Sequence, residues 1–151
     1  MRRRAGMKTP ALLFVVVLTL LLSACGEADL TREAHPTALG GSAWRVVSVN
    51  GRPPIAGSEP TAIFAATDVK GSAGCNSYGG QYAYDPATGA ITFRNLAMTA
   101  MGCVEPGRND FEGIFSTAIS KATSASIDPE GRLVLSGPGG EIVLAVDGVP
   151  S

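Results

Sequence analysis

The chain has 151 residues, of which 45% are hydrophobic, and its 12 basic and 13 acidic residues give a formal net charge of −1. This length suffices for one domain with a hydrophobic core and is too short for two domains of ordinary size. The charge balance excludes the large basic surface by which proteins bind the phosphates of nucleic acids.

The first 24 residues have the pattern of a bacterial secretory signal. Basic residues precede an apolar run from Ala11 to Leu22, which is too short to remain in a membrane as a spanning helix. The run ends in Leu22-Ser23-Ala24-Cys25, which resembles the lipobox that directs cleavage before a cysteine and attachment of lipid to its sulfur. We therefore expect residues 1–24 to be a lipoprotein signal peptide and Cys25 to carry the lipid. The alternative is an ordinary signal peptide with a cysteine near its cleavage site by chance.

Residues 25–38 are predicted to form a flexible tether between the lipid and the domain, because they are polar and lack apolar periodicity. Two or more acyl chains, such as palmitate, would hold the protein at a membrane. Gly26 follows the lipidated residue in place of an aspartate typical of inner-membrane retention. We expect the periplasmic face of the outer membrane in a host with two membranes, and otherwise the extracytoplasmic face of the cell membrane.

Cys75 and Cys103 are the cysteines that remain after lipidation of Cys25. In an oxidising compartment an even pair most often forms a disulfide, which would stabilise the fold by roughly 3 kcal/mol in the chain-entropy model. The alternative is a reactive thiol at Cys75, which needs a nearby base or helix N-terminus. The single histidine, His35, lies in the predicted tether.

The domain that follows has mostly the period-two alternation of half-buried strands. In residues 43–50 the alternation places Trp44 and Val46 on one face and Val49 on the other, and Asn50-Gly51 predicts a two-residue hairpin turn. We expect strands at residues 43–50, 61–65, 69–76, 80–85, 90–96, 125–127, 132–135 and 141–146.

One segment, residues 108–121, has helical spacing instead. Its apolar residues recur at intervals of three and four from Phe111 to Ala122, Asn109 or Asp110 is expected to cap its start, and Lys121 lies at its end. The sequence therefore predicts an α+β fold that is predominantly antiparallel β. We expect a curled sheet or a partly open small β-barrel of about seven or eight short strands with one amphipathic helix.

Residues 71–80, GSAGCNSYGG, raise the question of a functional loop. A phosphate-binding loop would need a lysine and a hydroxyl residue before a helix, and a nucleophile elbow would need a strand-to-helix turn with a base. Neither pattern is present. The stretch predicts a corner between two strands, where glycine permits positive φ and Asn76 tolerates the left-handed conformation or bonds its own backbone.

Four short motifs follow one another along the chain, at residues 39–44 (LGGSAW), 74–82 (GCNSYGGQY), 96–103 (LAMTAMGC) and 112–115 (EGIF). Together they resemble the successive motifs of the META domain, the family of heat-inducible, HslJ-like bacterial lipoproteins. The resemblance covers residues 39–147 and leaves residues 148–151 as a C-terminal tail. The positions that match the family motifs, all interpreted as framework, are Trp44, Gly74, Cys75, Asn76, Thr99 and Cys103.

The resemblance implies no specific enzymatic reaction, because META domains have no agreed enzymatic activity. It implies an association with envelope stress and drug tolerance. We expect a monomeric, non-enzymatic accessory module that contacts an envelope protein, with no catalytic residue, cofactor or metal. Met98 and Met101 without a thiolate or histidine would make a poor metal site. The alternative is a small barrel that binds a lipid-like apolar ligand or acts as a secretion pilot. A thiol-redox enzyme, the third option, would need Cys75 and Cys103 to cycle.

Overall fold

A computed structural model describes residues 34–147. The predicted signal peptide, Cys25, most of the predicted tether and the C-terminal tail lie outside the described residues.

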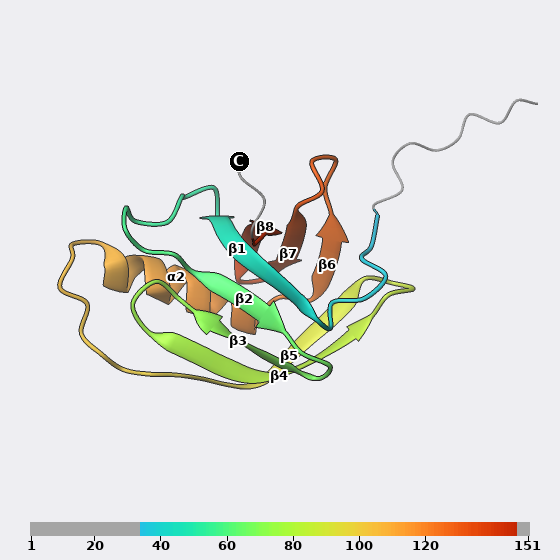
Figure 1. The fold of residues 1–151 in the computed structure, drawn as a ribbon, viewed down its shortest axis with the longest axis horizontal. Helices are drawn as coiled ribbons and strands as arrows, with labels where there is room; N and C mark the ends of the chain where they lie inside the picture. The colour runs from blue at the N-terminus through green and yellow to red at the C-terminus, as the bar shows by residue number, and fades with distance from the viewer. Residues whose placement is uncertain (1–33, 148–151) are drawn as a thin grey trace, which may run out of the picture. The chain divides into compact units, whose positions relative to one another are not determined.

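Eight antiparallel strands form a closed barrel in which each strand pairs with the next and the last returns to the first (Figure 1). For residues 34–147 this confirms the α+β fold with antiparallel strands and one helix. Between the fifth and sixth strands the register consists of the pair Ala90 and Ser124. The strands are β1 (Ser42–Val49), β2 (Thr61–Phe64), β3 (Asp68–Ser72), β4 (Ser77–Asp85), β5 (Ala90–Met98), β6 (Ser124–Ile127), β7 (Leu133–Gly137) and β8 (Gly140–Val146).

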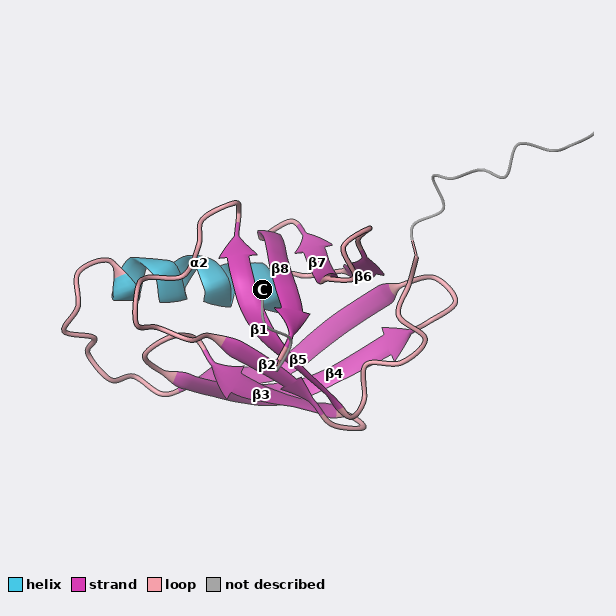
Figure 2. Cartoon of the chain, turned by 45° about the horizontal axis from the view of Figure 1, so that its top comes forward, coloured by secondary structure: helices cyan, strands magenta, loops and turns pink. Residues whose placement is uncertain are grey.

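The helix α2 (Arg108–Ser120) lies between β5 and β6 in the sequence and packs against β8, β5, β1 and β7 (Figure 2). Its apolar stripe, including Phe111, Phe115 and Ile119, is buried against the barrel as the spacing predicts. The β7–β8 hairpin approaches the end of the helix closely at Gly137, where a Cβ atom would overlap the carbonyl group of Lys121. Helix and barrel therefore share one hydrophobic core.

Aromatic side chains fill the interior of the barrel. The rings of Phe64 and Tyr82 meet edge to face at a centroid distance of 5.0 Å, and those of Tyr78 and Phe115 lie 5.3 Å apart. Phe64 and Phe115 are both at most 1% exposed. The space inside the sheet is thus occupied by the protein's own side chains.

The predicted position of Val49, on the face opposite Trp44 and Val46, is wrong. Val46 pairs with Leu144 and Ser48 with Val143, so one extra residue of β1 forms a β-bulge. A bulge reverses the inward and outward alternation beyond it, and Val49 is consequently buried in the core. The Asn50-Gly51 turn is confirmed, because both residues have positive φ, 50° and 73°, and their neighbours exchange two hydrogen bonds of 2.9 Å.

The predicted helix cap is also wrong. The N-cap residue is Gly107, whose φ is 82°, and no side chain caps the first turn. A left-handed residue at this position suits glycine, whereas Asn109 and Asp110 already lie inside the helix.

The last residues of the predicted tether contact the barrel. Ala34 forms an isolated β-bridge with Ile127, and the Tyr84 hydroxyl donates a hydrogen bond of 2.6 Å to the carbonyl oxygen of Pro36. A free tether can therefore extend only to the residues before Ala34.

Two glycines in adjacent strands provide a matched test of this packing. A Cβ atom at Gly71 would overlap the Thr61 carbonyl group, whereas one at Gly79 would lie 3.6 Å from the Val69 carbonyl oxygen, an ordinary contact. We expect Gly71→Ala to lower the free energy of unfolding by about 2–3 kcal/mol and Gly79→Ala to change it by less than about 1 kcal/mol. Urea denaturation measures both, and equal stability of the two variants would contradict the described β2–β3 packing.

Candidate functional site

The stretch between β3 and β4 forms a four-residue corner, residues 73–76. The Ala73 amide donates a hydrogen bond of 2.8 Å to the Asn76 carbonyl oxygen and closes it. Gly74 has a φ of 115°, and its amide donates to Ser72 Oγ at 3.0 Å. This confirms a corner with a positive-φ glycine, although β3 ends and β4 begins at Ser72 and Ser77. The left-handed conformation considered for Asn76 is wrong, since the non-glycine residues with positive φ among residues 34–147 are Asn50 and Asn95.

The side chain of Asn76 joins this corner to the segment that follows β5. Its Oδ1 accepts hydrogen bonds from Thr99 Oγ1 at 2.9 Å and from the Met101 amide at 2.7 Å. Its Nδ2 donates to the Met101 carbonyl oxygen at 3.0 Å and to Glu112 Oε2 at 2.8 Å. Asn76 is 4% exposed, so this amide replaces its bonds to water with four bonds inside the protein.

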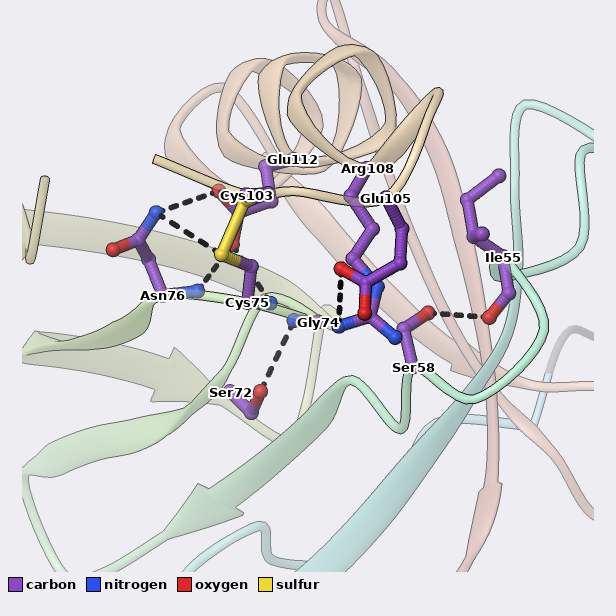
Figure 3. Close-up of polar contacts among 10 residues, drawn as sticks. All are labelled: Ile55, Ser58, Ser72, Gly74, Cys75, Asn76, Cys103, Glu105, Arg108 and Glu112. Carbon is purple, nitrogen blue, oxygen red and sulfur yellow. Dashed lines mark hydrogen bonds and ion pairs between the residues drawn. A yellow bond between two sulfur atoms is a disulfide. The ribbon is translucent and has the colours of Figure 1, made fainter. Parts of the chain in front are cut away.

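Glu112, from the first half of α2, is the buried charged side chain at the centre of this network (Figure 3). It is 6% exposed. Its Oε1 accepts hydrogen bonds from the amides of Cys75, at 3.0 Å, and Asn76, while its Oε2 accepts from Asn76 Nδ2. Both oxygens are therefore acceptors, as in an ionised carboxylate.

Glu112 was not predicted to be a site residue. A glutamate on an amphipathic helix is ordinarily assigned to the solvent face. The available signal was its spacing, because Glu112, Phe115 and Ile119 follow one another at intervals of three and four on the buried stripe.

Cys75 and Cys103 are joined by a disulfide, with their Cα atoms 6.0 Å apart and a sequence separation of 28. The sulfur of Cys103 lies 3.6 Å from Glu112 Oε2. The structure therefore brings five residues from three separate segments together. We call this group the corner cluster: Cys75, Asn76, Thr99, Cys103 and Glu112.

The other predicted framework position, Trp44, lies at the start of the barrel. Its indole nitrogen donates a hydrogen bond of 2.7 Å to Ser42 Oγ, which in turn donates to the Leu39 carbonyl oxygen at 2.5 Å. Hydrogen bonds between residues of the LGGSAW motif thus hold it together where the chain enters β1.

The surroundings of Cys75 do not supply the histidine base that a reactive thiol would use. His35 is the single histidine of the chain, and its Nδ1 lies 3.3 Å from the carbonyl oxygen of Ala125 in β6. The nearby phenol, Tyr78, donates a hydrogen bond of 2.9 Å to the Thr61 carbonyl oxygen, and burial raises the pKa of its hydroxyl. Tyr78 is thereby held in its neutral form as part of the core.

Clefts on the surface lie outside the barrel core. One of about 280 Å³ is lined mainly by apolar residues of α2 and of the β1–β2 connection, including Ile55, Phe111 and Ile114. Another of about 480 Å³ lies beside Tyr82 and Tyr84. Within residues 34–147 none of the helices has the length and apolar character needed to cross a membrane.

Comparison with known proteins places these features in a family context. The family model of the META domain matches residues 37–148. No protein among the curated ones matches the chain.

Similar folds occur among solved structures. A protein from Burkholderia xenovorans, solved by NMR, is 22% identical with a TM-score of 0.55, over 70% of this chain and 81% of its own. A second NMR structure is 26% identical with a TM-score of 0.57, over 72% and 91% of the two chains. A DUF4847 family protein from Bacteroides vulgatus is 18% identical with a TM-score of 0.51, over 74% and 96%. These likenesses show the fold.

An isosteric change at Asn76 tests the corner cluster. Asn76→Asp keeps the shape but removes the donor to Met101 and places a second carboxylate against Glu112, so we expect the free energy of unfolding to fall by about 3 kcal/mol. Asn95→Asp is the control, because Asn95 is exposed and bonds Gln81 Oε1 at 3.3 Å; its expected effect is less than about 1 kcal/mol. Similar stability of the two variants in urea denaturation would refute the described network.

Proposed function

Because the chain belongs to the META domain family, we propose that it is a lipid-anchored module of a bacterial cell envelope that acts by contact and carries out no reaction of its own. Its role in the cell is to support tolerance of envelope stress or of drugs.

The observation that carries this proposal is the engagement of the motif residues with one another. The side-chain amide of Asn76 bonds Thr99, Met101 and Glu112. Glu112 accepts hydrogen bonds from the backbone amides of the corner. The Trp44 indole donates a hydrogen bond to Ser42 in the same motif. A catalytic site needs polar groups directed toward a substrate, whereas these groups are directed toward the framework.

An exposed apolar loop supports a role in contact. Met101 is 59% exposed and Val104 is 91% exposed, on either side of Cys103. The disulfide and the Asn76 bonds to Met101 hold the base of this loop. Apolar side chains held in a fixed position outside the core are suited to contact with another protein.

The alternative, an apolar ligand inside the barrel, has less support. The rings of Phe64, Tyr82 and Phe115 occupy the interior that such a ligand would need. An apolar ligand inside the barrel would usually need a cavity of at least about 300 Å³ in this interior.

The lipid anchor is tested by labelling. We expect the full chain, produced in a bacterium fed a palmitate analogue, to incorporate label and to sediment with membranes. Cys25→Ala removes the sulfur that receives the lipid and should abolish the label, whereas Cys75→Ser should retain it. Label that persists in Cys25→Ala would contradict the anchor.

Survival of the source bacterium under stress tests whether the protein acts through contact by its exposed loop. In the source bacterium, deletion of the gene should reduce survival under heat or drug treatment, and the parent gene should restore it. We expect no rescue by Cys25→Ala and reduced rescue by Met101→Ser with Val104→Ser. Ile63→Ser, which changes another exposed apolar residue, should rescue fully. Full rescue by the Met101 and Val104 double variant would refute the loop as the contact surface.

A further inference from the structure

We propose that reduction of the Cys75–Cys103 disulfide converts the corner cluster into a binding site for a thiophilic divalent cation, with Zn²⁺ as the fitting ion. The ligands are the two sulfur atoms and Glu112 Oε2. The inference is independent of the lipid anchor and of the contact function proposed above.

The spacing of the ligand atoms fits such a site. One ligand atom from each of Cys75, Cys103 and Glu112 lies within 4.8 Å of the others. In a tetrahedral zinc site, with Zn–S near 2.3 Å and Zn–O near 2.0 Å, a sulfur and an oxygen ligand are about 3.5 Å apart. The observed distance from Cys103 Sγ to Glu112 Oε2 is 3.6 Å. The two sulfurs would have to separate to about 3.8 Å once their bond is broken.

The carboxylate is already oriented by other groups, as ligands of protein metal sites are. Oε1 is held by the amides of Cys75 and Asn76, whereas Oε2 accepts from Asn76 Nδ2 and faces the sulfur of Cys103. An ionised oxygen retains a lone pair after one such bond. Asn76 is fixed in turn by Thr99 and Met101. Glu112 can therefore bind a cation without giving up the hydrogen bonds that hold it.

The chemistry balances with a dithiol as the reductant. The dithiol supplies two electrons and two protons, so the S–S bond breaks, two cysteine thiols form, and the dithiol is oxidised to its own disulfide. Binding of the cation then releases the two thiol protons as two metal–sulfur bonds form. Two thiolates favour Zn²⁺ or Co²⁺ over Mg²⁺ and Ca²⁺. Three protein ligands leave a fourth position for water, on the side where Cys75 and Cys103 are only half-buried.

Cobalt provides a direct probe of this site. The full chain carrying Cys25→Ser, so that Cys75 and Cys103 are its only thiols, is reduced, freed of reductant without oxygen, and titrated with Co²⁺. We expect one Co²⁺ per chain with sulfur-to-cobalt charge-transfer absorption, displacement by Zn²⁺, and no such absorption in the oxidised protein. Reduced protein that binds no more Co²⁺ than a variant with Cys75→Ser and Cys103→Ser would overturn the proposal.

The carboxylate ligand has its own control. Glu112→Gln, on the same background, should weaken Co²⁺ binding at least tenfold, whereas Glu105→Gln, a partly exposed glutamate that pairs with Arg108, should leave it unchanged. Equal affinity of these two variants would overturn Glu112 as a ligand.

Because Glu112→Gln could unfold, the unfolding temperature of the reduced parent is measured as well. Zn²⁺ should raise this temperature in the reduced parent and leave it unchanged in the oxidised parent, and the absence of a rise would also overturn the proposal.

Discussion

The buried carboxylate of Glu112 is the interaction on which the arrangement of this domain depends. The amides of Cys75 and Asn76 donate to it at a corner where strand pairing has ended. An amide left without an acceptor in such a place costs about 1–3 kcal/mol. The carboxylate comes from α2, so satisfying the corner also fixes the start of the helix over the barrel. A single side chain thus couples two elements that are far apart in sequence.

The disulfide and Asn76 extend this coupling to the connection between β5 and α2. Cys103 joins that connection to the corner covalently, and Asn76 binds the backbone of Met101 on both its donor and acceptor sides. Three of the four sequence motifs of the META domain therefore meet in the corner cluster. The disulfide of these motifs and their hydrogen bonds to Met101 hold the base of the exposed loop that carries Met101 and Val104.

Patterns that depend on neighbours in sequence were sufficient to predict the strands, the helix and the Asn50-Gly51 turn. The errors arose where a distant partner decides the outcome. Val49 changes face because β1 has a bulge where it pairs with β8, and β4 begins earlier than predicted because Ser77 already pairs with Ser72 across a corner closed by the Ala73 amide and the Asn76 carbonyl oxygen. Glu112 was missed because its acceptor role becomes visible only when residues 75 and 76 are placed beside the helix. Its spacing places it on the apolar stripe of the helix, but periodicity does not show which donors a buried carboxylate accepts from.

Native-state hydrogen exchange at the amides of Cys75 and Asn76 tests the central claim most directly, since these are the donors that Glu112 satisfies. If the carboxylate holds helix and corner as one unit, both amides exchange only on global unfolding, with the same free energy as the amide of Leu144 in the barrel core. Exchange of either amide through a local opening, at a free energy well below that of Leu144, would show that the corner moves independently of the barrel and would contradict this account.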